Sequence, residues 1–231
     1  KLWAWRAGRI RQLRRYVDLG LSILPFETNY FSDRGLRTAY IGNPCVDAKL
    51  TYLAEHPEPV EREQMLLLVP GSRQSELRNN LPEMLAATAA YSQLGWHVVI
   101  AGAPGLTAAD YAPHLGKYSD TPILFGDTYG LMRRAHAALV TSGTATLEAG
   151  LWSIPMVVCY RMGGRRIARL AFERLFRVPY FSLVNLILDR PAVHELLADT
   201  PCRSSQSSPA SSPRRTTAAP TSCRHWPSCR S

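Results

Sequence analysis

The stretch LVTSGTATLEAGL, residues 139–151, is the part of this sequence that most clearly predicts its fold. Its apolar start predicts the end of a buried strand, the Ser142-Gly143-Thr144 run predicts a tight turn, and the Ala- and Leu-rich remainder predicts a helix. The stretch places one carboxylate, Glu148, on the first full turn of that helix and on the same face as Thr144. Strand, small-residue turn and helix are the parts of a βαβ unit whose helix N-terminus can face an anion.

The same alternation of strand and helix continues along most of the chain. Strands are predicted at 65–70, 96–104, 122–127, 136–142 and 154–160, and helices at 75–95, 106–116, 128–135, 144–152 and 165–176. Short apolar strands that alternate with helices are typical of right-handed βαβ units on a parallel sheet. The predicted fold class is therefore α/β, with a Rossmann-like doubly wound parallel sheet.

The chain is predicted to divide into four parts. Residues 16–48 have the same strand-helix-strand rhythm, so residues 1–54 are predicted to be the remnant of an N-terminal Rossmann-like domain. A Pro- and charge-rich stretch predicts a linker at 55–62, followed by a C-terminal domain at 63–200. Residues 201–231 are rich in Ser, Pro, Thr and Ala and predict a disordered tail, either genuine or the product of a frame shift. Because the chain does not open with Met, we expect a fragment cut at its N-terminus.

Composition excludes several classes of function. Hydrophobic residues make up 46% and charged residues 19%, enough for a buried core, and no apolar run approaches the roughly 20 residues of a membrane span. The net charge is +9, but five arginines and no acidic residue lie in 201–231, so the basic excess does not predict a nucleic-acid partner. The five cysteines form no CxxC pair and no zinc spacing, so we expect neither metal nor cofactor.

The loop after the first strand of the C-terminal domain is a candidate phosphate site. Ligands bind open α/β sheets outside the carboxyl ends of the strands. Here Gly71 permits a tight turn, Ser72 offers a hydroxyl, and Arg73 places a cation at a helix N-terminus, where phosphate binds well. The alternative is that Ser72 is only an N-cap, since Ser75 stands where a capping box has Glu.

The opening stretch forms a second candidate loop. Ser142, Gly143 and Thr144 follow one strand and open one helix, and Glu148 can accept hydrogen bonds from the two hydroxyls of a ribose. The alternative for Glu148 is a solvent-facing charge. A nucleophile elbow needs G-x-S-x-G, whereas Ser142 lies in T-S-G-T. Walker, GxGxxG and DxD motifs are absent, so we expect Arg73 and backbone dipoles to meet the phosphate charge without a metal.

With both loops placed, the chain resembles the lipid-A-disaccharide synthases, inverting glycosyltransferases of the GT-B type with two Rossmann-like domains. The matching stretches are LWAWRAGRI (2–10), YVDLGLSILPFE (16–27), YIGNPCVDA (40–48), LLLVPGSRQSELRNNLPEML (66–85), ALVTSGTATLEAGLWSIPMVVCYRM (138–162) and YFSLVNLILDRPAVHELL (180–197). They keep the order of the family, and the pairing of PGSR-x-x-E with SGTATLE is their most specific part.

The resemblance implies an enzyme of lipid A biosynthesis in Gram-negative bacteria. The implied reaction transfers 2,3-diacylglucosamine from UDP to 2,3-diacylglucosamine 1-phosphate (lipid X), giving the lipid A disaccharide and UDP. The resemblance implies a cytoplasmic enzyme that is peripheral to the inner membrane, and it leaves open whether the enzyme forms a homodimer. Trp3 and Trp5 lie among basic residues, as on a membrane-surface helix, or they pack in the core of the missing domain.

The resemblance also implies which residues bind UDP. These are Gly71, Ser72 and Arg73 at the diphosphate, Ser142, Gly143 and Thr144 at phosphate or ribose, Glu148 at the ribose, the loop from Gly126 to Met132 near the uracil, and Asn185 near the nucleotide. The catalytic residue is not identified, because the family's general base is expected in the missing N-terminal region. We therefore expect this fragment to be inactive alone. Two alternatives stay open: a non-catalytic UDP-binding remnant, or another GT-B enzyme acting on UDP-GlcNAc.

Overall fold

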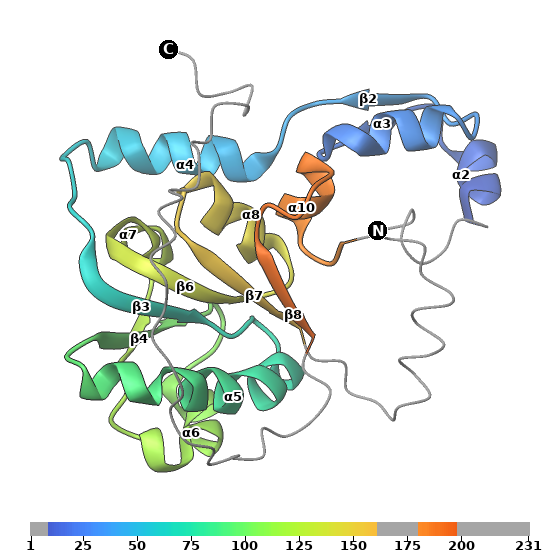
Figure 1. Ribbon diagram of the computed structural model, residues 1–231. Coiled ribbons are helices and arrows are strands. Elements are labelled where there is room, and N and C mark those ends of the chain that lie inside the picture. Colours follow the sequence, from blue (N-terminus) through green and yellow to red (C-terminus); the bar gives the residue numbers. More distant parts are fainter. Residues whose placement is uncertain (1–8, 161–179, 198–231) are drawn as a thin grey trace, which may run out of the picture. The chain divides into compact units, whose positions relative to one another are not determined.

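The computed structural model describes residues 9–160 and 180–197 (Figure 1). The helix predicted at 165–176, the tail predicted at 201–231, and Trp3 and Trp5 lie outside the described residues. The division of the chain into four parts stays a prediction.

The first described elements form a small parallel βαβ unit. They are α2 (Ile10–Tyr16), β1 (Gly20–Ser22), α3 (Pro25–Ser32) and β2 (Thr38–Tyr40). The two strands pair in parallel, with Gly20 opposite Thr38. Ile10, Phe31 and Leu36 form the small core of this unit. The strand-helix-strand rhythm predicted for residues 16–48 is confirmed.

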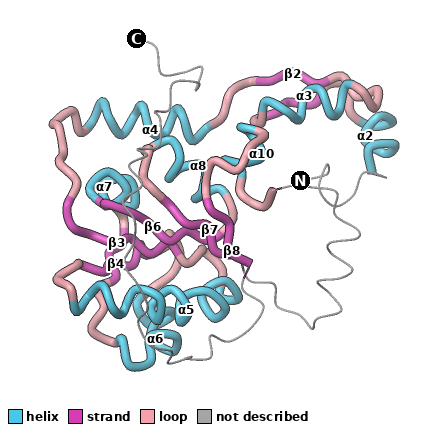
Figure 2. Tube along the Cα trace, in the orientation of Figure 1, coloured by secondary structure: helices cyan, strands magenta, loops and turns pink. Residues whose placement is uncertain are grey.

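A six-stranded parallel sheet forms the centre of the larger part of the fold (Figure 2). Its strands are β3 (Glu63–Val69), β4 (His97–Gly102), β5 (Ile123–Phe125), β6 (Ala135–Thr141), β7 (Met156–Tyr160) and β8 (His194–Leu197). Their spatial order is β5-β4-β3-β6-β7-β8, and every neighbouring pair is parallel. This is the order of a Rossmann sheet, which reverses between β3 and β6. The predicted fold class is confirmed.

Helices cover both faces of this sheet. They are α4 (Pro44–Glu55), α5 (Gln74–Gln93), α6 (Ala108–Leu115), α7 (Thr128–Arg134), α8 (Thr144–Leu151) and α10 (Leu183–Leu188), with a short 3-10 turn at Gly116–Tyr118. Figure 1 shows α5 and α6 on one face and α4, α7, α8 and α10 on the other. No described helix is long and apolar enough to cross a bilayer.

The two cores follow from the alternation of side chains along β3. Leu67 and Val69 belong to the core under α7 and α8, whereas Leu66 and Leu68 belong to the core under α5 and α6. Successive side chains of a strand point to opposite faces, so a strand buried on both faces needs an unbroken apolar run. The run in β3 satisfies this requirement.

Hydrogen bonds connect α4 to α8, and the segment after α4 to α7. Lys49 Nζ donates a 2.9 Å hydrogen bond to the last carbonyl of α8. Arg133 of α7 donates to the carbonyl of His56, at 2.9 Å, and to that of Glu58. The segment predicted to be a linker, 55–62, is therefore held at its carbonyls by α7.

Candidate functional site

A cleft of about 750 Å³ opens at the carboxyl ends of the central strands. This volume lies within the roughly 300–1,000 Å³ of small-molecule sites, and the position is the reversal point of the sheet, where such folds bind ligands. The cleft is lined from the loops after β3, β4, β5 and β6, including Gly71–Arg73, Ala101–Pro104, Gly126–Tyr129 and Thr141–Ala145, and by Tyr52, Glu76 and Glu148.

Most of the predicted site residues come together in this cleft. Gly71, Ser72, Arg73, Gly126, Ser142, Gly143, Thr144 and Glu148 all line it. Met132 and Asn185 do not line it. Met132 is fully buried in the core beneath α7, because it lies on the face of this short helix that meets the sheet.

Asn185 holds the turn that leads into β8. Its Oδ1 accepts hydrogen bonds from the backbone N–H groups of Ala192 (2.8 Å) and Val193 (2.9 Å). Its Nδ2 donates to the Val193 carbonyl (2.9 Å) and to Glu195 (2.8 Å). With 1% of its surface exposed and its amide engaged by protein partners, Asn185 stabilises this turn and does not line the cleft.

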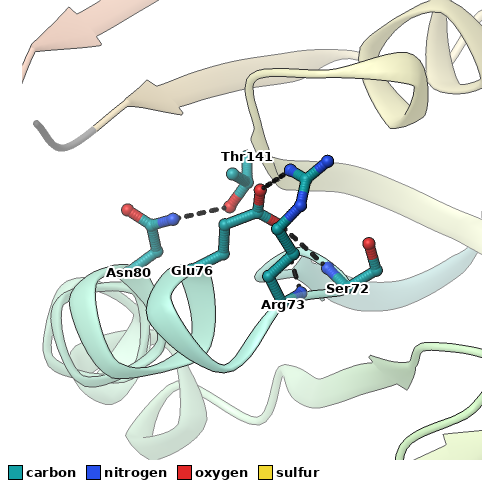
Figure 3. A network of polar contacts seen from close by, with 5 residues as sticks. All are labelled: Ser72, Arg73, Glu76, Asn80 and Thr141. Carbon is teal, nitrogen blue, oxygen red and sulfur yellow. Dashed lines mark hydrogen bonds and ion pairs between the residues drawn. The ribbon is translucent and has the colours of Figure 1, made fainter.

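The first predicted loop is organised by the carboxylate of Glu76, which is not among the predicted site residues. Helix α5 begins after Arg73, which is its N-cap, so the alternative that Ser72 is the cap is wrong. Glu76 Oε2 accepts from the N–H groups of Ser72 (3.0 Å) and Arg73 (3.3 Å), and its Oε1 pairs with Arg73 Nη1 at 2.5 Å (Figure 3). A Glu three residues after the N-cap is the sequence signal of such capping.

A buried hydrogen bond joins the helix after the first candidate loop to the strand before the second. Asn80 Nδ2, on α5, donates to Thr141 Oγ1, at the end of β6, at 3.1 Å (Figure 3). Both residues are 5% exposed, so water does not replace either partner easily. The pair adds a side-chain link to the backbone pairing of β3 and β6, which places the two loops side by side.

In the second loop the free donors are those of the α8 helix rather than the Ser142 hydroxyl. The Ser142 N–H donates to the Cys159 carbonyl (3.1 Å) and its Oγ donates to the Phe181 carbonyl (2.9 Å). The Thr144 side chain is exposed and has no hydrogen-bond partner in the described parts of the chain. The first N–H groups of a helix have no partner within it, so the start of α8 offers donors to the cleft.

Two tyrosines hold the carboxylates at the other wall of the cleft. Tyr129 donates its hydroxyl to Glu148 Oε1, and Tyr52 donates its own to Asp127 Oδ1, each at 2.9 Å. Asp127 also caps α7 through the N–H of Gly130 (2.9 Å). Burial, followed by the hydrogen bond to Glu148, raises the pKa of Tyr129, so this hydroxyl keeps its proton at neutral pH. Glu148 is half-buried and bonded, which contradicts the alternative of a solvent-facing charge.

Charge in the cleft is mixed. Among the described residues that line it, Arg73 is the one cation, and Glu76, Asp127 and Glu148 carry carboxylates. No group of three or more metal-ligating side chains occurs in residues 9–160 and 180–197. The arrangement offers donors to an anion on one side and acceptors to hydroxyls on the other.

Comparison with known proteins gives the family. The profile of the family described as lipid-A-disaccharide synthetase matches residues 1–213, and thus extends into the segment predicted to be a tail. Similar proteins include the lipid-A-disaccharide synthases of Acidobacterium capsulatum, 36% identical over 222 residues, and Myxococcus xanthus, 36% identical over 204 residues. These alignments cover 86% and 85% of this chain but 54% and 53% of those proteins, so the chain spans about half the length of the curated relatives it matches. Because the profile covers most of its length, the chain belongs to the lipid-A-disaccharide synthetase family.

Proposed function

We propose that the cleft binds the UDP part of UDP-2,3-diacylglucosamine and that the chain contributes the donor half of a hexosyltransferase of lipid A biosynthesis. One observation carries this proposal. The Arg73 guanidinium, the open N-terminus of α8 and the Glu148 carboxylate line one cleft at the reversal point of a Rossmann sheet. Cation and helix N-terminus suit a diphosphate, and the carboxylate suits a ribose diol.

Each wall of the cleft has its own role in this proposal. The diphosphate lies between Arg73 and the first turn of α8, around Gly143 and Thr144. The ribose hydroxyls donate to Glu148, which Tyr129 holds in orientation. The uracil lies toward the loop that begins at Gly126. As UDP leaves, the guanidinium and the helix dipole stabilise the charge that develops on the diphosphate.

Acceptor, location and assembly belong to the same proposal. The acceptor is lipid X and the product is the lipid A disaccharide, in line with the name that the similar proteins carry. Because both sugars are acylated, we propose that the protein works at the cytoplasmic surface of the inner membrane. We also propose a homodimer and no nucleic-acid partner. The general base is unassigned, and we propose that the chain alone does not complete the transfer.

Calorimetric titration of the 231-residue chain with UDP tests the donor site. We expect binding, and we expect Arg73→Ala to weaken it by about tenfold, the lower end for a charge-assisted hydrogen bond, because Arg73 is exposed. Glu148→Ala should weaken UDP but not inorganic pyrophosphate, which has no ribose. Arg78→Ala on the exposed side of α5 is the matched control and should leave affinity unchanged. Absence of UDP binding by a chain with native circular dichroism refutes the proposal.

A further inference from the structure

The loop Gly71–Arg73 has the geometry of an anion-binding site, and the carboxylate of Glu76 already occupies it. Successive N–H groups of a turn that leads into a helix make a concavity that normally receives phosphate. Here the N–H groups of Ser72 and Arg73 and the Arg73 guanidinium all donate to Glu76, at 3.0, 3.3 and 2.5 Å (Figure 3). The two oxygens of Glu76 thus take the place of two oxygens of a phosphate.

The backbone is shaped to admit this carboxylate. Gly71 has φ +110°, a conformation that L side chains rarely adopt. A Cβ added at Gly71 would lie 2.7 Å from the Cβ of Glu76 and would displace it. The side chain of Glu76 is 24% exposed whereas that of Arg73 is 76% exposed, so the carboxylate lies inward, against the loop.

The opposite wall carries a second anion-binding turn, at the start of α8. No described residue accepts from the N–H groups of Thr144 and Ala145 at the start of α8, and both residues line the cleft. In the proposed complex the diphosphate lies against these N–H groups, in a cleft that Arg73 and Glu76 also line. A third phosphate bound in this cleft therefore also meets the charge of the Glu76 carboxylate.

We infer that Glu76 determines specificity: because its carboxylate occupies the anion-binding loop at Gly71–Arg73, the cleft binds nucleoside diphosphates more tightly than nucleoside triphosphates. This inference rests on the proposed function of the cleft. The added phosphate of UTP brings a further negative charge toward the Glu76 carboxylate. Two unit charges about 6 Å apart, at an effective dielectric constant of about 40, repel by an energy that corresponds to about tenfold in affinity.

Calorimetric titration of the full chain with UDP and with UTP, in EDTA so that no divalent ion neutralises phosphate, tests the inference. We expect UTP to bind about tenfold more weakly than UDP. Glu76→Gln keeps an oxygen that can accept from the loop N–H groups but removes the charge, so the ratio of the two dissociation constants should fall toward one. Glu76→Asp keeps the charge and should retain discrimination.

Glu83→Gln is the matched control, because it makes the same change on the same helix outside the cleft. It should leave the UTP-to-UDP ratio at the value of the unaltered chain. If UDP binds but UTP binds equally well, or if Glu76→Gln leaves the ratio unchanged, the role of Glu76 is refuted and the donor site stands. If the folded chain does not bind UDP, the proposed function fails and this inference fails with it.

Discussion

Replacing Tyr129 by Phe removes one hydroxyl at the wall of the cleft and leaves the ring in place. The hydroxyl donates to Glu148 at 2.9 Å. The ring meets those of Tyr52 and Trp152, each with centroids 5.7 Å apart, and Phe preserves both contacts. The change in the free energy of unfolding therefore reports the hydrogen bond rather than packing.

The size of the effect follows from the charge and the exposure of the acceptor. Hydrogen bonds to charged groups contribute about 1.5–3 kcal/mol. Glu148 is half-buried and lines an open cleft, so water partly replaces the lost donor. We expect Tyr129→Phe to lower the free energy of unfolding by about 1.5 kcal/mol, at the lower end of that range.

Urea unfolding followed by circular dichroism measures this change. With a slope of about 2 kcal/mol per molar urea, the midpoint should fall by about 0.7 M while the slope stays constant. Tyr118→Phe is the matched control: Tyr118 is half-buried and its hydroxyl has no hydrogen-bond partner among the described residues, so its change should stay within about 0.5 kcal/mol. Tyr129→Phe and Glu148→Ala should be non-additive. Additivity within about 0.5 kcal/mol would refute the reasoning.

Two further predictions concern the frame of the cleft. Thr141→Val keeps the side-chain shape but leaves the Asn80 amide without its acceptor, so the free energy of unfolding in urea should fall by about 1–3 kcal/mol. Thr141→Ser keeps the hydroxyl and should restore most of that loss. Equal stabilities of the Val and Ser variants would contradict this. Burial first, and the Glu148 charge second, raise the pKa of the Cys45 thiol from 9.0 to about 11. The folded pKa exceeds the unfolded one, so this contribution to stability is complete below pH 9 and is lost as the pH rises toward 11. Glu148→Gln should speed alkylation of Cys45 at pH 9, measured by peptide mapping. The rate at Cys159 should stay unchanged, because burial alone raises the pKa of that thiol to about 11. Equal alkylation rates of Cys45 in the unaltered chain and in Glu148→Gln would show that Glu148 does not act on it.

The sequence-based predictions agree best with the structure where local chemistry decides. The run in β3 is apolar at every position from Met65 to Val69, which predicts a strand buried on both faces, and the structure confirms it. Predicted and observed bounds of α8 differ by one residue, since its small-residue start and apolar face are local features. Helix α5 begins at Gln74 because Arg73 is its cap, so the predicted start at 75 is one residue late.

The predictions for individual site residues diverge where distant parts of the chain compete for the same atoms. The Ser142 hydroxyl, predicted to face a phosphate or ribose, is engaged by the Phe181 carbonyl, and Asn185 is engaged by the turn before β8. Tyr52 lies in α4, far from the cleft in sequence, yet its hydroxyl bonds Asp127. Nothing in the local pattern around these residues specifies the partner.

The sequence by itself determined the parallel sheet and the edge at which its loops gather. Strands of one direction end at one edge, so the loops at Gly71–Arg73 and Ser142–Thr144 had to meet there once the βαβ pattern was set. Only the tertiary structure decided which donors of those loops are available. Glu76 accepts from the N–H groups of Ser72 and Arg73, whereas those of Thr144 and Ala145 have no acceptor among the described residues. The physical reason is that a hydrogen bond depends on where two groups lie in space, and periodicity specifies the position of only one of them along its own element.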